Sequence, residues 1–243
     1  MNFYMLVEGK SEKTIYPAWL NHLLPEIKRV NSPQAVQSNN YYLFSSEGYP
    51  SVLNDIPNAV SDIKEINKFD YFIIAVDADE LEVEERRKEV YDVINEIGNL
   101  DGLNIQIIIQ NRCIETWCLG NMRIFPRHPS TNEFMLCNQH YRVLSDDPEL
   151  MDRDKNVTQK TTKAQYHEYY LNKMLKERNL NYSKGSGTRA VQPPYYLEEL
   201  IHRVETTDHI KSFKEFILFI RGISELIKSR LHVATGEEAN QNN

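Results

Sequence analysis

The sequence predicts an α/β fold with a parallel sheet of about four strands and helices on both of its faces. Two observations support this prediction. Apolar runs of strand length alternate with segments of helical periodicity through the first half of the 243-residue chain, which is the pattern of β-α-β units. The run at 69–76 is also apolar at nearly every position, as expected for a strand covered on both faces.

Four strands are predicted, and each is a run of apolar and aromatic residues that ends at a polar or turn-forming cluster. In chain order they occupy 3–7, 41–44, 69–76 and 104–111. Helices are predicted where apolar residues recur every three or four positions. In the first half these are 11–29, 52–66 and 82–98, followed by a helix in the stretch CIETWCLGN.

The pattern weakens after about residue 124. The stretch 125–163 is rich in Pro, Asn and Asp and predicts an irregular insertion with short helices. Helical periodicity then returns at 164–179, 194–206 and 210–232. We therefore expect an α/β domain at 1–122, an irregular insertion and helical C-terminal region at 123–232, and a flexible tail at 233–243.

Composition narrows the class of protein. The chain is 41% hydrophobic and 26% charged, which excludes collagen-like and mostly disordered chains. No apolar run is long enough to span a bilayer, and the N-terminus lacks the layout of a signal peptide. Three cysteines, an odd number, argue against a disulfide framework. We expect a cytoplasmic protein without membrane contact.

The charge is distributed unevenly. The net charge of −7 does not by itself indicate nucleic acid. Ten acids face three bases between 77 and 101, whereas nine Lys and Arg residues face four acids between 151 and 189. The basic segment could supply phosphate contacts that an acidic site cannot.

Two acidic motifs follow predicted strands. Asp77-Ala78-Asp79 comes directly after the third strand, and Glu8-Gly9 ends the first strand. A D-x-D pair alone is often only a hydrophilic turn. Glu12 lies in the first turn of the helix that follows Glu8-Gly9, where the helix dipole favours an acid without any ligand. Gly9 allows a sharp turn and the approach of a phosphate to the helix start.

The two motifs become informative together. Ligands of open parallel sheets lie beyond the carboxyl ends of the strands, where both motifs fall. Clustered carboxylates repel one another and raise each other's pKa unless a cation is bound. Oxygen ligands of this kind suit Mg²⁺ or Mn²⁺, so the sequence predicts a divalent metal site.

These motifs resemble the TOPRIM domain. The resemblance rests on VEG-x-x-E after the first strand and AVDADE about seventy residues later, and it covers roughly 1–122. The stretch NRCIETWCLGN is similar to the segment after the last core strand in stand-alone TOPRIM proteins of the Old-like and PARIS-type phage-defence groups. By this resemblance, Glu8 corresponds to the glutamate at the end of the first TOPRIM strand, and Asp77 and Asp79 correspond to the TOPRIM aspartate pair. Glu12 corresponds to the additional acid that Old-like proteins carry on the first helix.

The resemblance implies a metal-dependent nuclease that hydrolyses phosphodiester bonds in DNA or RNA. It implies Mg²⁺ or Mn²⁺ on Glu8, Asp77 and Asp79, with a second ion or a base near Glu12. It further implies a toxic defence effector controlled by an ABC-type ATPase partner. A homodimer is left open, because symmetric dimers are common among soluble proteins.

Other residues are assigned to the site from their positions. Glu115, one turn into the helix after the fourth strand, is a further metal ligand or else an acid paired with Arg112. The loop YSKGSGTRAVQPP carries Lys184 as a candidate transition-state cation, or is a plain linker. The expected substrate contacts are Gly9, Lys10, Arg112, Lys184 and Arg189.

Three other functions remain open. A TOPRIM-fold subunit could bind nucleic acid without turnover. A glycosyltransferase could use the D-x-D pair to hold a nucleotide sugar through Mn²⁺, which leaves Glu8 without a role. A haloacid-dehalogenase-type phosphatase needs D-x-D-x-[TV] on the first strand, whereas here the pair follows the third.

Overall fold

A sheet of five parallel strands, in the order β2-β3-β1-β4-β5, forms the centre of the molecule. The fold is that of a computed structural model, which describes residues 1–157 and 160–241, with side chains described up to residue 230. The strands are β1 Phe3–Val7, β2 Lys28–Val30, β3 Asn40–Ser45, β4 Tyr71–Asp77 and β5 Asn104–Gln110.

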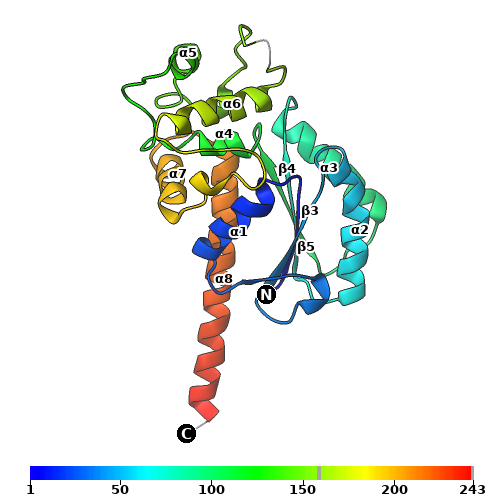
Figure 1. The fold of residues 1–243 in the computed structure, drawn as a ribbon. Coiled ribbons are helices and arrows are strands. Elements are labelled where there is room, and N and C mark those ends of the chain that lie inside the picture. Colours follow the sequence, from blue (N-terminus) through cyan, green and yellow to red (C-terminus); the bar gives the residue numbers. More distant parts are fainter. Residues whose placement is uncertain (158–159, 242–243) are drawn as a thin grey trace.

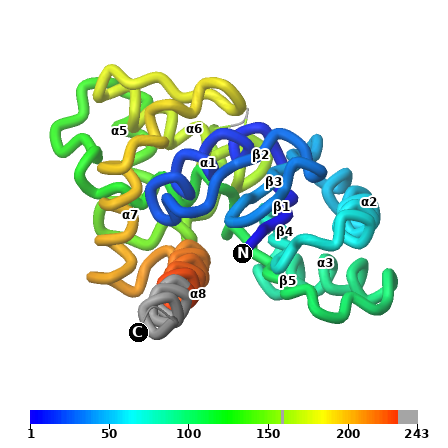
Figure 2. Tube along the Cα trace, turned by 90° about the horizontal axis from the view of Figure 1, so that it is seen from below, coloured from blue at the N-terminus to red at the C-terminus, as the bar shows by residue number. Residues whose placement is uncertain are grey.

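Helices cover both faces of this sheet (Figure 1). One face carries α2 (Ser51–Ile66) and α3 (Val83–Ile97), and the other carries α1 (Glu12–Leu23) and the long α8 (Lys211–Gln241), as the view from below also shows (Figure 2). The remaining elements lie mostly beyond the carboxyl ends of the strands: α4 (Ile114–Cys118), α5 (Asn132–His140), α6 (Lys163–Lys176) and α7 (Pro194–Thr206), with 3₁₀ turns at Pro33–Ala35, Pro148–Leu150 and Arg189–Val191.

Strand β1, at the centre of the sheet, is apolar throughout because its successive side chains enter two different cores. On β1, Phe3, Met5 and Val7 pack with α1 and α8, whereas Tyr4 and Leu6 pack with α2 and α3. All five are buried. The prediction of an α/β fold with helices on both faces is therefore confirmed.

The C-terminal region completes the first of these cores. Phe216 of α8 stacks on Trp117, with ring centroids 5.8 Å apart, and meets the Tyr16 ring edge-on at 5.4 Å. Apolar residues from before and after position 122 thus share one cluster. Helix α8 therefore completes, together with α1, the cover of the sheet face opposite α2 and α3.

The structure corrects the element predictions at several points. The sheet has five strands rather than four, because the three-residue β2 was assigned to the end of a helix at 11–29. That helix ends at Leu23. Helix α8 continues through Gln241, across most of the segment expected to be a tail, and residues 242–243 lie outside the described residues. Flexibility of this tail stays a prediction.

In the part of the chain that the structure describes, no helix is both long and apolar enough to cross a membrane.

Candidate functional site

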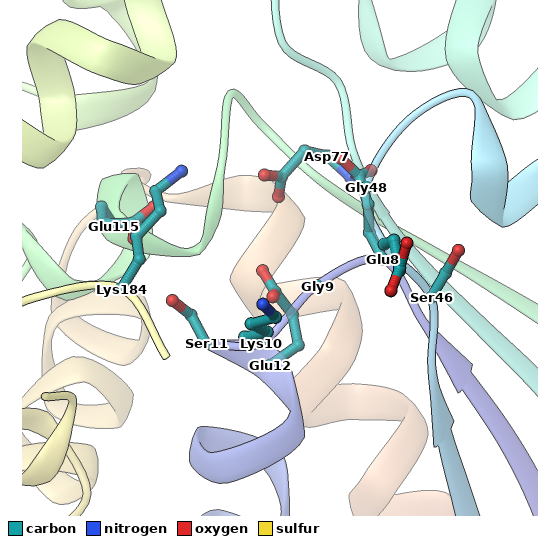
Figure 3. Close-up of a pocket in the computed structure, with 11 residues that line it drawn as sticks. Glu8, Gly9, Lys10, Ser11, Glu12, Ser46, Gly48, Asp77, Glu115 and Lys184 are labelled. Atoms are coloured by element: carbon teal, nitrogen blue, oxygen red, sulfur yellow. The ribbon is translucent and has the colours of Figure 1, made fainter. Parts of the chain in front are cut away.

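A pocket of about 470 Å³ lies at the carboxyl ends of β1, β3 and β4 (Figure 3). Four buried carboxylates line it, and one lysine reaches it from a distant loop. The carboxylates are Glu8, Glu12, Asp77 and Glu115, and the lysine is Lys184. The other lining residues are Gly9, Lys10, Ser11, Ser46, Glu47 and Gly48.

Glu8 and Asp77 are brought together by the parallel pairing of β1 with β4. The backbone N–H of Asp77 donates a hydrogen bond to Oε2 of Glu8 at 2.9 Å. Burial raises the pKa of Glu8 to about 6, and Asp79 adds to the rise. The pKa of Asp77 is raised well above its usual range by burial and then by the nearby charges of Glu8, Glu12 and Glu115. One oxygen of Asp77, Oδ1, is buried without a hydrogen-bond partner among the described residues.

Glu12 opens helix α1 and turns back toward the same pocket. Burial raises its pKa to about 8, with a further contribution from Glu115. Gly9 leaves room for this side chain, because a Cβ at Gly9 would lie 3.1 Å from Oε2 of Glu12. In Figure 3 the carboxylates of Asp77 and Glu12 point into the space between Glu8 and Lys184.

Glu115 enters the pocket from α4. It accepts a hydrogen bond from the hydroxyl of Tyr182 at 2.7 Å through Oε1, while its buried Oε2 has no hydrogen-bond partner in the described part of the chain. It does not pair with Arg112, which was the alternative interpretation. The guanidinium of Arg112 instead contacts Glu82 at 3.1 Å and the carbonyl of Leu81.

Lys184 is held over the pocket by a loop that is tied to α1. The N–H of Gly185 donates to Oγ of Ser11 at 3.3 Å, and the hydroxyls of Thr14 and Thr188 lie 2.7 Å apart. Glu115 is the main reason that the pKa of Lys184 is raised. The side chain is half exposed, and its Nζ lies 3.8 Å from Glu168. The loop is therefore part of the site rather than a plain linker.

Asp79 does not line the pocket. Its backbone has a positive φ of 53°, and its carboxylate faces Arg86 at 3.8 Å. The guanidinium of Arg86 is buried, pairs with Glu89 at 2.7 Å and lies 3.7 Å from the ring centroid of Tyr49. Asp77 and Asp79 thus face different surroundings in this conformation.

Of the predicted substrate contacts, some line the pocket and others do not. Gly9 and Lys10 line the pocket beside Lys184. Arg112, engaged with the start of α3, and Arg189, exposed in the 3₁₀ turn after the loop, are not among the lining residues.

The donor set suits a hard divalent cation because it consists of carboxylate oxygens. Two of these oxygens are buried without a hydrogen-bond partner among the described residues. The side chains have not converged on one point, however. Among the described residues, no three His, Cys, Asp or Glu side chains are arranged to hold an ion. Binding of an ion would therefore require one or more of these carboxylates to turn inward.

Sequence reasoning missed the residues that support the site from a distance. Tyr182, which hydrogen-bonds Glu115, and Arg86, which holds Asp79, are ordinary members of a loop and a charged helix. Tyr182 could have been found only from its position in the sequence, two residues before Lys184.

The three cysteines, all in the described part of the chain, are buried and form no disulfide. The side chains of Tyr166 and Tyr170 are also buried and belong to the hydrophobic core.

Comparison with known proteins gives no match to any family model, curated protein or solved structure.

Proposed function

We propose that this protein is a divalent-metal-dependent nuclease with a TOPRIM-like fold that hydrolyses phosphodiester bonds in DNA or RNA. The observation that supports it is the meeting of Glu8, Glu12, Asp77 and Glu115 with Lys184 in one pocket at the strand ends. Such a group of buried acids destabilises a protein unless a cation or protons neutralise it. A purely structural role would not explain why the fold retains this destabilising group of buried carboxylates.

The residues have separate roles in this proposal. Asp77 and Glu8, with Glu115 or Glu12, would hold Mg²⁺ or Mn²⁺, which would polarise the phosphate and stabilise the leaving oxygen. Glu12, whose pKa burial raises to about 8 in the empty pocket, would be ionised beside a bound cation and would then accept a proton from water. The ammonium of Lys184 would stabilise charge that develops on the phosphate oxygens. Asp79 would act only after leaving Arg86.

The test is cleavage of DNA and RNA in the presence of Mn²⁺ by the wild-type protein and by Asp77→Asn. We expect cleavage by the wild type and a loss of at least about 100-fold in the variant, since removing one electrostatic stabiliser of a transition state commonly costs this much. No cleavage of either nucleic acid, or equal cleavage by both proteins, would reject the proposal.

The alternative is a non-catalytic subunit that binds nucleic acid. It is favoured by one observation, the lack of a converged three-residue metal group among the described residues. It predicts that the wild-type protein binds nucleic acid but does not cleave it in the presence of Mn²⁺.

Control by an ABC-type ATPase and a role as a toxic defence effector are proposed from the TOPRIM resemblance. If they hold, expression of the wild type without the ATPase slows bacterial growth, and expression of Asp77→Asn does not.

A further inference from the structure

A second pocket, of about 440 Å³, has three arginines and a histidine among its eight lining residues, and we refer to it as the cationic pocket. Its lining comes from the segment 123–130, which joins α4 to α5, and from the C-terminal end of α6. Its basic side chains are Arg123, Arg127, His128 and Arg178, and Glu177 is the one carboxylate among its lining residues. It shares no lining residue with the carboxylate pocket.

The one carboxylate of this cationic pocket is already engaged. Glu177 accepts hydrogen bonds from the backbone N–H of Ser130 at 2.8 Å and from its hydroxyl at 2.9 Å. It also accepts from the N–H of Thr131 at 2.8 Å and from the Thr131 hydroxyl. Both carboxylate oxygens are therefore used to hold the loop. Glu177 keeps its negative charge, which offsets one of the three arginines that line the pocket.

The pocket is also held in shape by its own backbone. Arg178 donates from Nε to the carbonyl of Ile124 at 2.9 Å and from a terminal nitrogen to the carbonyl of Phe125 at 3.1 Å. Phe125 is buried in the core. These contacts orient the Arg178 guanidinium and leave its remaining N–H donors available.

The other basic side chains of the pocket are available to a ligand. Arg127 and His128 make no hydrogen bond or ion pair with any described residue. Arg123 has one long contact of 3.7 Å with Glu199, and its side chain is 75% exposed. A protein with a net charge of −7 thus carries a pocket with a local excess of positive charge.

We infer that this cationic pocket binds backbone phosphates of a nucleic acid, away from the bond to be cut. Guanidinium groups present forked donors that match phosphate oxygens, and several arginines around one cavity suit a polyanion. The inference rests on the proposed function in one respect: the acidic active-site pocket repels phosphates, so a nucleic-acid substrate needs a separate positive contact.

The test is binding of a fluorescein-labelled single-stranded DNA, and of the RNA of the same sequence, in EDTA so that cleavage plays no part. The variant is Arg123→Gln with Arg127→Gln, since neither residue makes a strong contact in the fold. The control is Arg29→Gln with Arg230→Gln, which removes the same charge from exposed positions elsewhere. Thermal unfolding of each variant checks that it is folded.

We expect the pocket variant to bind about tenfold or more weakly near physiological salt and the control to bind like the wild type. The slope of log K against log salt should also fall by about 1.4, because each phosphate contact on a single strand contributes about 0.7.

Equal loss in the control, or unchanged binding in the pocket variant, would overturn the inference and leave an acidic protein segment as the candidate ligand. Wild-type protein that binds neither probe would overturn it as well. Binding that depends on the pocket, without any cleavage in Mn²⁺, would support the inference and reject the nuclease.

Discussion

At the scale of single residues, the defining feature is a set of carboxylates buried at a place where the fold gains nothing from them. Asp77 and Glu115 each keep one buried oxygen without a partner among the described residues. The backbone N–H of Asp77 and the hydroxyl of Tyr182 compensate only part of this loss. Binding of a cation in the pocket would explain why these carboxylates are buried with unpaired oxygens.

This view predicts that Asp77→Asn stabilises the metal-free protein. An amide removes one of several mutually repelling charges, so the free energy of unfolding at pH 8 in EDTA should rise by about 1 kcal/mol, the value of roughly one pKa unit. Urea unfolding measures it. Glu47→Gln, at the exposed rim of the same pocket, should change little. Destabilisation by Asp77→Asn would show that this carboxylate is structural.

The raised pKa of Glu12 predicts the pH dependence of stability. Between its ordinary pKa of 4.5 and about 8, folded Glu12 keeps a proton that the unfolded chain releases. The unfolded state then binds fewer protons, so the free energy of unfolding falls as pH rises. Below pH 6.5 the buried His167, whose pKa burial lowers to about 4, gives the opposite trend. The window for the test is therefore pH 6.5 to 8.

Urea midpoints in EDTA should fall across this window for the wild type and fall less for Glu12→Gln. Saturating Mn²⁺ should reduce the fall, because a bound cation favours the ionised carboxylates. A midpoint that rises from pH 6.5 to 8 would contradict the assignment of a protonated, buried Glu12.

At the scale of elements, the site depends on two turns that bring distant segments together. The turn after β1 places Glu12 beside Gly9, and the loop before α7 brings Lys184 to the pocket. Within that loop, Ser183 and Gly187 form an isolated antiparallel bridge, and Gly185 has a positive φ of 82°. These local geometries determine whether Lys184 faces the carboxylates.

Gly187→Ala should therefore impair cleavage more than folding. A Cβ at Gly187 would lie 1.9 Å from Oγ of Ser183 and 2.9 Å from its backbone N and O, so the loop must move and carry Lys184 with it. We expect cleavage to fall by about tenfold or more, the value of a modest electrostatic contribution, with a small change in the unfolding midpoint.

The matched control for this loop variant is Gly222→Ala on α8, where a Cβ meets nothing within 4 Å. It should stabilise the protein slightly, because Ala is the better helix former, and should leave cleavage unchanged. Full activity of Gly187→Ala would mean that the loop geometry does not matter.

The elements also show where prediction from sequence succeeds. β1 and β4 were predictable because burial on both faces makes them apolar at nearly every position. β5 was predictable from its buried Ile107, Ile108 and Ile109. β2 was missed because it is a three-residue edge strand with Lys28 and Arg29 exposed, so it has no apolar pattern to detect. Asp79 was placed in the site because its spacing from Asp77 is visible, whereas its positive φ and its pairing with Arg86 are not.

At the scale of the whole molecule, the C-terminal half is part of the fold rather than an appendage. The long-range contacts of α8 with α1 and with the sheet create one core across residue 122. Periodicity could predict α8 as a helix but could not predict which surface it covers. Lys184 also reaches the pocket from this half of the chain.

Phe216→Ala should accordingly destabilise the entire protein. The ring is buried and contacts Trp117 and Tyr16, so we expect a loss of about 3–5 kcal/mol in the free energy of unfolding. Leu218→Ala, two positions along the same helix and 58% exposed, should cost far less. Equal effects in urea unfolding would argue against α8 as a core element.

The central claim is that a divalent ion binds among side chains at the carboxyl ends of β1 and β4. A crystal structure with Mn²⁺, in which the ion is located by its anomalous scattering, tests it most directly. The account predicts an ion bound to Asp77 together with Glu8, Glu12 or Glu115, with these carboxylates turned inward. Crystals saturated with Mn²⁺ that show no ion in this pocket, or an ion only elsewhere, would contradict it.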